Sequence, residues 1–243
     1  MVLAGKKVFV TGGAVRVGAE IVRAFAREGA FLTIHYRESV SEASALLKEI
    51  GGKEKGHGLF QMDFSGGNFR EDTDSFRRLG EIFSGTDILV NNASCFFRKG
   101  LAEETMEEME KQFQVNFFAP VRLMKLFAAS TEGPRCILNI LDQGIAKTDS
   151  KAFSYALSKK ALAEATKSAA LSLAPRIRVN GIAPGPMLPP ADMPFSKMEK
   201  SREAIPRKRI VSTKDVAESC LFAARNESMT GAILFVDGGL SLL

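Results

Sequence analysis

Short runs of apolar residues alternate with amphipathic stretches along nearly the whole chain. Seven of these runs have the length and composition of buried strands: Val8–Thr11, Phe31–His35, Gly58–Met62, Ile88–Val90, Cys136–Leu141, Ile177–Ile182 and Ala232–Val236. Between most of them, apolar positions recur with the helical period, at residues 17–28, 40–50, 68–83, 102–130, 153–173 and 214–224. Strands that alternate with helices indicate βαβ units, and hence a parallel sheet covered on both faces.

The right-handed crossover of βαβ units then predicts how such a sheet is wound. We expect an α/β fold built on a doubly wound, Rossmann-type parallel sheet of about seven strands, with helices on both faces. No stretch rich in Pro, Gly or Ser is long enough to separate two units. The sequence therefore predicts a single domain over residues 1–243.

A glycine-rich turn follows the first strand. The segment Gly12-Gly13-Ala14-Val15-Arg16-Val17-Gly18 lies between the strand ending at Thr11 and a helical pattern from Ala19. Glycines let the backbone approach a pyrophosphate, and the N–H groups of a helix N-terminus favour an anion there. The spacing, Thr-Gly-x-x-x-Arg-x-Gly, differs from the common G-x-G-x-x-G. The context favours a dinucleotide site over an ordinary βα turn.

Three residues in the second half of the chain indicate proton chemistry. Tyr155 and Lys159 are four residues apart on a predicted helix, so their side chains share one face. A nearby lysine is expected to lower the pKa of the phenol from about 10, which suits a proton donor. Asp142 ends an apolar run, where ligands bind in such sheets. The alternatives are a helix with a solvated lysine and an aspartate that only caps a turn.

The end of the second predicted strand indicates the cofactor. NAD-selective folds place an acid there for the ribose hydroxyls. This strand ends in His35-Tyr36-Arg37, with Ser39 just beyond, and a cationic Arg37 or His35 can pair with a 2′-phosphate. Glu38 argues against a phosphate at this place, although alternation along the chain predicts that its side chain points away from the side of Arg37. We therefore expect NADPH.

Composition and charge exclude other classes. A hydrophobic fraction of 45% and a charged fraction of 25% are ordinary globular values, and no apolar run is long enough to span a membrane. The N-terminus leads into the first strand without a signal peptide, so we expect a cytoplasmic protein with no membrane partner. Cys95, Cys136 and Cys220 lack metal-like spacing and the chain has only two histidines, so no metal is expected.

The net charge of +5 lies in one segment. Residues 197–214 contain seven basic and two acidic side chains, so the rest of the chain is balanced. Nucleic-acid binders usually spread basic residues over a face with aromatics between them, and we expect no nucleic-acid partner. The segment is either a solvated loop or a rim that attracts an anionic substrate or cofactor.

Along nearly its whole length the chain resembles the short-chain dehydrogenase/reductases. The shared features are Thr11–Gly18, Asp63, Asn91-Asn92-Ala93, Asn116, Tyr155-x-x-x-Lys159, Pro184-Gly185 and Asp237-Gly238-Gly239. The resemblance implies that Asn116 orients a water behind Lys159 and that Asp63 meets the adenine ring. It also implies a homotetramer packed through the long later helices and the last strand, and a substrate loop around residues 186–212.

Two departures from that family pattern point to one branch. Where the family has a catalytic Ser, thirteen residues before Tyr155, this chain has Asp142; where it has a small residue, this chain has Arg16. Both resemble the pteridine reductases, including dihydromonapterin reductases. The branch also shares His35-Tyr36, Asn92-Ala93-Ser94-Cys95-Phe96 and Asp192-Met193-Pro194. Its pattern implies that Phe96 stacks on a pterin, Arg16 reaches pterin and cofactor phosphates, and Ser94 hydrogen-bonds in the cleft.

The predicted reaction is hydride transfer from NADPH to a C=N bond of a pterin, dihydropterin or folate-type heterocycle. Tyr155 or a water protonates the ring nitrogen, Asp142 supplies or relays the proton through a raised pKa, and Lys159 holds the nicotinamide ribose. The predicted substrate residues are Arg16, Ser94, Phe96, Asp142 and Tyr155. The predicted cofactor residues are Gly12, Arg16, Val17, His35, Tyr36, Arg37, Ser39, Asp63, Asn92, Ala93, Ser94, Lys159, Pro184 and Gly185.

Two alternatives stay open at this point. The first is an ordinary carbonyl reductase, for example of 3-oxoacyl thioesters, in which Asp142 merely replaces Ser. The second is a non-catalytic, NADP-binding regulatory module, against which the joint presence of Tyr155, Lys159 and Asn116 argues. Fold-level analogy alone does not choose between them.

Overall fold

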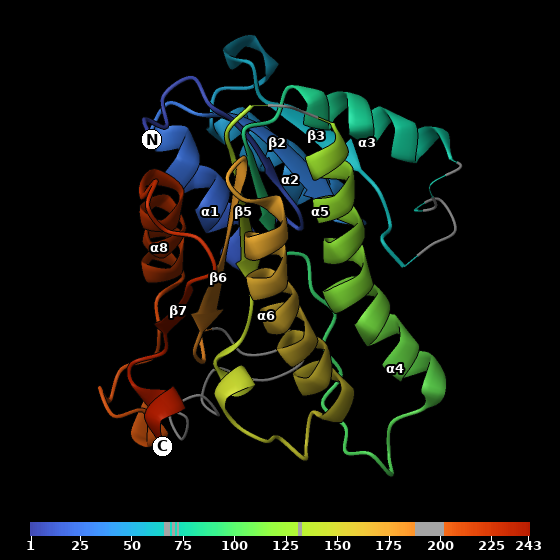
Figure 1. Ribbon diagram of the computed structural model, residues 1–243, viewed down its shortest axis with the longest axis vertical. Coiled ribbons are helices and arrows are strands. Elements are labelled where there is room, and N and C mark those ends of the chain that lie inside the picture. The colour runs from blue at the N-terminus through green and yellow to red at the C-terminus, as the bar shows by residue number, and fades with distance from the viewer. Residues whose placement is uncertain (66–68, 70, 72, 131–132, 188–201) are drawn as a thin grey trace.

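The protein is built around one seven-stranded sheet, seen in the computed structural model of Figure 1, which describes residues 1–65, 69, 71, 73–130, 133–187 and 202–243. Every strand pairs in parallel with its neighbours, in the order β3-β2-β1-β4-β5-β6-β7. The strands are β1 (Lys7–Val10), β2 (Phe31–Tyr36), β3 (Gly58–Gln61), β4 (Ile88–Asn91), β5 (Arg135–Ile140), β6 (Ile177–Pro184) and β7 (Ile233–Val236). The doubly wound α/β prediction is confirmed.

Alternation along the strands divides the core between two faces. Val8 and Val10 of β1 pack into a core that includes side chains of α1 (Arg16–Arg27), α2 (Val40–Glu49) and α8 (Thr213–Arg225). Phe9, between them, packs into the opposite core with α3 (Asp74–Ser84), α5 (Ala119–Ala129) and α6 (Phe153–Leu173). In Figure 1, α1 and α8 accordingly lie side by side, across the sheet from α5 and α6. Both faces are buried, which explains why the strands read as continuous apolar runs.

The predicted helix 102–130 is wrong in its start and in its continuity. Helix α4 (Met106–Phe113) begins at Met106, because Thr105 and Glu108 form a reciprocal capping box there. A π-helical turn, Gln114–Phe118, then separates α4 from α5. Pro120 explains the interruption, because proline has no N–H to donate to the carbonyl of Asn116, four residues earlier, and its ring crowds that carbonyl.

The predicted helix 68–83 also differs from the structure. The described helix is α3, Asp74–Ser84, and its start is marked by Thr73, whose side chain accepts a hydrogen bond from the Phe76 N–H. Residues 66–68, 70 and 72 lie outside the described part of the chain. The other predicted helices and strands agree with the structure to within two residues at each end.

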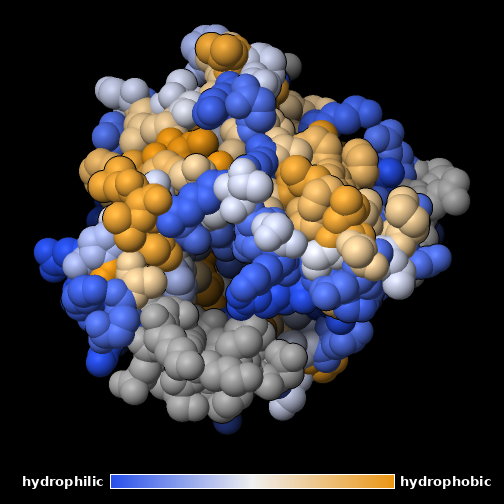
Figure 2. Space-filling view, turned by 90° about the horizontal axis from the view of Figure 1, so that it is seen from below, coloured by the Kyte–Doolittle hydropathy of each residue, from blue (hydrophilic) through white to orange (hydrophobic). Residues whose placement is uncertain are grey.

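The sheet topology places a binding crevice at one edge. The strand order reverses between β1 and β4, and ligands of doubly wound sheets bind outside the carboxyl ends of strands at such a point. Figure 2 shows the molecule from that end, where the surface is hollowed near its centre between hydrophilic residues. In the described part of the chain, no helix is both long enough and apolar enough to cross a membrane.

Candidate functional site

A cavity of about 480 Å³ lies at the carboxyl ends of the strands. All fourteen predicted cofactor residues line it, from Gly12 to Gly185 in chain order, and so does Asp142. Phe96 and Asn116 are not among the described residues that line this cavity. The sequence-predicted residues are thus brought to one place, although they come from segments more than 100 residues apart.

The glycine loop after β1 is tightly packed against its own backbone. Gly12 has a left-handed φ of 58°, and a Cβ on Gly18 would lie 2.1 Å from the Gly12 carbonyl oxygen. Thr11 and Asn92 brace the loop: the Asn92 amide donates to the carbonyls of Thr11 and Gly12, at 2.9 and 3.0 Å. The Thr11 hydroxyl accepts from the N–H groups of Asn92 and Ala93. The glycine loop is therefore fixed by hydrogen bonds to the residues that follow β4, and no side chain fills it.

Arg16 stands at the first position of α1 and lines the cavity. Its φ of 54° is left-handed, a conformation that costs a non-glycine residue roughly 1–3 kcal/mol and that clusters at functional sites. The residue is exposed, and α1 has no acidic side chain in its first turn. The helix N-terminus and the Arg16 guanidinium together form a positive end to the cavity.

His35 occupies a different position from the one that phosphate pairing requires. Its Nδ1 accepts the Gly12 N–H at 3.0 Å, and its Nε2 lies 3.0 Å from the Met62 carbonyl oxygen, to which it donates. The ring is buried and stacks on Phe64 at 4.1 Å. Burial lowers the pKa of His35 to about 4, so the ring is neutral at pH 7. His35 therefore supports the glycine loop and offers no positive charge.

Arg37 and Glu38 lie together, which corrects the expectation that alternation separates them. The Arg37 guanidinium donates to the Glu38 carboxylate at 3.0 Å, and both side chains are exposed. The alternation rule does not apply here because β2 ends at Tyr36. Nearby, Asp63 accepts from the N–H and hydroxyl of Ser65 at 2.8 and 2.7 Å, and these bonds help hold its pKa below the usual value.

Asp142 uses both carboxylate oxygens at the end of β5. Its Oδ2 accepts the Tyr155 hydroxyl at 3.1 Å, and its Oδ1 accepts the Gly144 N–H at 2.7 Å. It therefore caps a turn and contacts the phenol at the same time. Burial raises the pKa of Asp142, against the opposing effect of its hydrogen bonds and of Lys159.

The phenol and the lysine differ from the sequence-based expectation. Burial, followed by the neighbouring Asp142, raises the pKa of Tyr155 well above 10, whereas the sequence predicted that Lys159 would lower it. The Lys159 ammonium lies 5.9 Å from the centre of the Tyr155 ring and donates to the Ile140 carbonyl at 2.9 Å. Burial lowers the pKa of Lys159 to about 8. Asp142, which contacts the phenol directly, therefore outweighs the more distant Lys159 ammonium in setting the pKa of Tyr155.

The loop after β4 carries Phe96 to the edge of the site. The Phe96 ring meets the Tyr155 ring edge-on, with centroids 4.7 Å apart, and 42% of Phe96 is exposed. The Ser94 hydroxyl and the Cys95 N–H both donate to the buried Asn116 side chain, at 3.0 and 2.8 Å. Asn116, in the π turn, thereby fixes the loop that leads to Phe96.

The basic segment does not reach the cavity in its described part. None of the described residues between 202 and 214 lines the cavity. Arg209 pairs with Asp215 at 2.7 Å, and the Lys208 ammonium donates to the Glu203 carbonyl. These contacts fit the solvated-loop alternative. Lys197, Lys200 and the Asp192-Met193-Pro194 motif lie outside the described residues, as does most of the predicted substrate loop.

Sequence reasoning missed several residues that support the site. Thr11 holds the turn after β4, and a network of Glu104, Gln112 and Ser154 lies behind Phe96 and Tyr155. Thr11 was part of the glycine-loop motif recognised in the sequence, but its hydroxyl was given no role there. Gln112 and Glu104 carry no local signal, because they are 8 residues apart in the chain and their other partners are 15 to 50 residues away.

Comparison with known proteins gives the family. A family model described as Enoyl-(Acyl carrier protein) reductase matches residues 13–241. The chain belongs to the short-chain dehydrogenase/reductase family. Within this family it is 32% identical to pteridine reductase 1 of Leishmania tarentolae, over 96% of this chain and 95% of that protein.

Two solved members of the short-chain dehydrogenase/reductase family share its fold closely. They are crystal structures of FolM alternative dihydrofolate reductase 1 complexed with NADP, from Brucella canis and Brucella suis. The TM-scores are 0.90 and 0.89, each with 32% sequence identity; the matches cover 100% of this chain and 96% and 97% of those chains. The family resemblance drawn from the motifs is confirmed.

Proposed function

We propose that this protein uses NADPH to reduce a C=N bond of a pterin, dihydropterin or folate-type heterocycle. It is an NADPH-dependent oxidoreductase, as its family and its NADP-bound neighbours indicate. The observation that carries the substrate proposal is the hydrogen bond between Asp142 and Tyr155, in which a carboxyl stands where the family has a hydroxyl. A simple ketone reduction needs one proton donor and gains nothing from a second acid with a raised pKa.

The cavity fits a dinucleotide phosphate. Glycines keep the loop free of side chains where a Cβ would clash, the N-terminus of α1 points its N–H groups there, and Arg16 and Arg37 supply positive charge. We assign the pyrophosphate to the loop of Gly12–Gly18, the 2′-phosphate to Arg37 and Ser39, and the adenine side to Asp63. Pro184 and Gly185 also line this cavity. When bound there, NADPH supplies the hydride.

The Asp142–Tyr155 pair supplies the proton. Both groups have raised pKa values, so the phenol is protonated at neutral pH and the carboxyl holds its proton more strongly than an ordinary aspartate does. Tyr155 donates its proton to the ring nitrogen next to the reduced carbon, and Asp142 or solvent returns one to the phenol. This balances the reaction, since one hydride and one proton reduce one C=N bond.

Lys159 and Asn116 support this transfer. The buried Lys159 ammonium is anchored by the Ile140 carbonyl, one turn from Tyr155, and we assign it to the nicotinamide ribose. The missing N–H of Pro120 denies the carbonyl of Asn116 its regular helical partner, which suits the water that we assign to it behind Lys159.

Phe96 is the proposed stacking surface for the substrate. A flat, electron-poor ring against its exposed face gains roughly 0.5–1.5 kcal/mol beyond area burial. Arg16 and Ser94, which line the cavity, are the proposed hydrogen-bonding partners of the heterocycle. Neither the stacking on Phe96 nor these hydrogen bonds require the substrate to carry an acyl chain.

A substrate panel tests this function. NADPH oxidation is measured with dihydropterins, dihydrofolate, 3-oxoacyl thioesters and simple ketones, using the wild-type protein and Asp142→Ser. We expect turnover of the pterin class by the wild type, its loss in Asp142→Ser, and at most weak ketone reduction by the variant. Turnover of thioesters with indifference to pterins would instead establish the carbonyl reductase alternative; no turnover of any class would favour the non-catalytic module.

We further propose that the protein is a homotetramer. Support comes from exposed apolar side chains on the surfaces that the family resemblance assigns to assembly: Met106, Phe118, Leu171, Phe222 and Phe235. A second cavity of about 830 Å³ is lined by residues of α4 and the π turn on one of these surfaces. Light scattering of the purified protein, with a monomer mass of 26.4 kDa, measures the assembly directly. The cytoplasmic location stays a prediction.

A further inference from the structure

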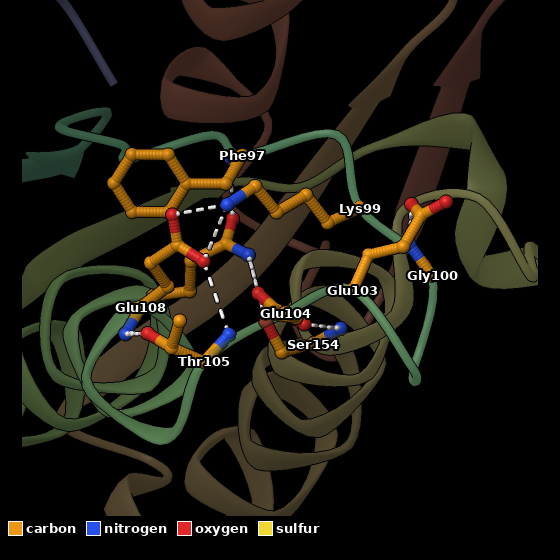
Figure 3. Close-up of polar contacts among 9 residues, drawn as sticks. Phe97, Lys99, Gly100, Glu103, Glu104, Thr105, Glu108 and Ser154 are labelled. Carbon is orange, nitrogen blue, oxygen red and sulfur yellow. Dashed lines mark hydrogen bonds and ion pairs between the residues drawn. The ribbon is translucent and has the colours of Figure 1, made fainter.

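The helix that carries Tyr155 is capped from a distant segment. Ala152, which precedes α6, has no polar side chain to satisfy the free N–H groups of the first turn. The Phe153 N–H donates instead to the Lys99 carbonyl at 3.0 Å. The Ser154 N–H donates to the Glu104 carboxylate at 3.2 Å (Figure 3). A carboxylate also interacts favourably with the positive end of the helix dipole. The cap lies one residue from the proposed proton donor.

The same carboxylate joins a hydrogen-bond network with Gln112. The Gln112 side chain is fully buried, and its amide N–H groups donate to Glu104 at 2.6 Å and to the Ser154 hydroxyl at 2.7 Å. The Ser154 hydroxyl donates in turn to Glu104. The Gln112 carbonyl oxygen accepts the Phe97 N–H at 3.0 Å. These side chains use their donors and acceptors on one another or on the backbone, which makes the arrangement specific.

This network connects the two backbones that present the rings of the site. Phe97 follows Phe96, and Ser154 precedes Tyr155, while the two rings themselves meet at 4.7 Å. In Figure 3, Glu104 lies beside Ser154, which is in the first turn of α6, and Phe97 is on the loop above them. A change in the network therefore alters the position of the phenol relative to Phe96 and to the Asp142 carboxyl.

We propose that Glu104 and Gln112 are positioning residues that set the geometry of Tyr155 and Phe96 for proton transfer. This inference rests on the proposed function in one respect, the role of Tyr155 as proton donor. Neither residue lines the cofactor cavity, and neither touches the reacting atoms. Both act through the first turn of α6 and the loop after β4. A displacement of about 1 Å at a reacting group can reduce turnover by roughly a hundredfold.

The Glu104→Gln variant tests this with the smallest change of shape. One Glu104 oxygen receives the Gln112 amide and the Ser154 hydroxyl, and the other receives the Ser154 N–H, so an NH₂ at either position faces a donor. We expect kcat to fall about tenfold, with the Kd for NADPH within about twofold of wild type, because the cofactor residues lie elsewhere. The matched control is Glu103→Gln, whose exposed carboxylate accepts the nearby Gly100 N–H at 3.2 Å, outside the network, and whose kcat should not change.

A reciprocal exchange provides the rescue. In the double variant Glu104→Gln/Gln112→Glu, the carboxylate introduced at position 112 can accept the Phe97 N–H, the Ser154 hydroxyl and the amide N–H introduced at position 104. The amide oxygen at position 104 then accepts the Ser154 N–H. Each bond is restored with the charge moved to the other side chain, and kcat should return to within about threefold of wild type. Ser154→Ala is a milder variant, which keeps the backbone cap and should lose less activity than Glu104→Gln.

The assay uses whichever substrate class the wild-type protein reduces, pterin or carbonyl. Failure of the wild type on pterins then overturns the proposed substrate and leaves this test intact. A loss of kcat in Glu104→Gln with intact NADPH binding and rescue by the exchange supports the positioning role. It is overturned by a Glu104→Gln kcat equal to that of Glu103→Gln, or by losses confined to melting temperature and NADPH binding. An exchange variant with wild-type melting temperature but unrescued kcat overturns it as well.

Discussion

At the scale of single residues, the proposed chemistry depends on the position of Asp142. It shares one carboxyl between the Gly144 N–H and the Tyr155 hydroxyl, in surroundings that raise its pKa. We expect Asp142→Asn to reduce pterin turnover about tenfold or more, because the amide keeps a hydrogen bond but holds no transferable proton. The affinity for NADPH should change little. Unchanged turnover would remove Asp142 from the mechanism.

The same residue should be visible in the dependence of kcat on pH. Since burial raises the folded-state pKa of Asp142, the wild-type kcat should fall as pH rises through that pKa and the carboxyl loses its proton. A pH–rate profile of Asp142→Asn should lack this descending limb. A limb that persists in the variant would assign it to another group, such as Lys159, whose pKa is about 8.

Arg37 is the expected determinant of cofactor choice. Arg37→Ala should weaken NADPH binding by roughly 1.5–3 kcal/mol, the free energy of a charge-assisted hydrogen bond, and NADH binding hardly at all. Direct titration of both cofactors measures the difference, and a wild-type preference for NADH would contradict the assignment.

On the proposed assignment of the 2′-phosphate to Arg37, Glu38 competes with the cofactor for the same guanidinium. Its ion pair with Arg37 is exposed, so the pair contributes at most about 1 kcal/mol. Glu38→Gln should therefore strengthen NADPH binding by up to about fivefold, and more at low than at high salt. Weaker binding in this variant would show that Glu38 orients Arg37 rather than opposing the phosphate.

At the scale of secondary-structure elements, the proposed role of Asn116 depends on the interruption between α4 and α5. The π turn holds Asn116, whose side chain fixes the loop that leads to Phe96. Pro120→Ala permits a regular helix and should leave the melting temperature equal or higher. We expect kcat to fall about threefold or more because Asn116 moves. A stabilised variant with full activity would contradict this.

At the scale of the whole molecule, His35 links β2, β3 and the glycine loop through two backbone bonds. Its pKa of about 4 lies below the ordinary 6.5, mainly because of burial and despite the nearby Asp63. The unfolded chain therefore takes up a proton first as pH falls. Stability should be lost progressively between about pH 6.5 and pH 4, by roughly 3 kcal/mol from this residue.

His35→Gln separates this charge effect from the structural role. A glutamine can accept from Gly12 and donate to Met62 without titrating, so its free energy of unfolding should depend less on pH over this interval than that of the wild type. His35→Leu leaves the Gly12 N–H unpaired and should also weaken NADPH binding. Denaturant titrations at pH 7 and pH 5 measure the free energies of unfolding, and a direct titration measures NADPH binding. Parallel pH curves for wild type and His35→Gln would show that His35 is not the source of the pH dependence.

The sequence by itself determined the order of elements, the glycine loop, the Tyr155–Lys159 spacing and the family. These depend on short-range periodicity and on residues a few positions apart, where backbone geometry leaves few arrangements. The start of α4 also depends on residues close in the chain, the capping box of Thr105 and Glu108, and the break that follows depends on Pro120.

Only the tertiary structure decided the pKa values and the hydrogen-bond partners of these residues. The raised pKa of Tyr155, the neutral buried ring of His35 and the capping of α6 by Glu104 each depend on partners 13 to 50 residues away. Burial and through-space hydrogen bonding set protonation and orientation, and neither is encoded in spacing along the chain. Residues that line the cavity could therefore be predicted from the sequence, whereas their charge states and their supporting network required the folded molecule.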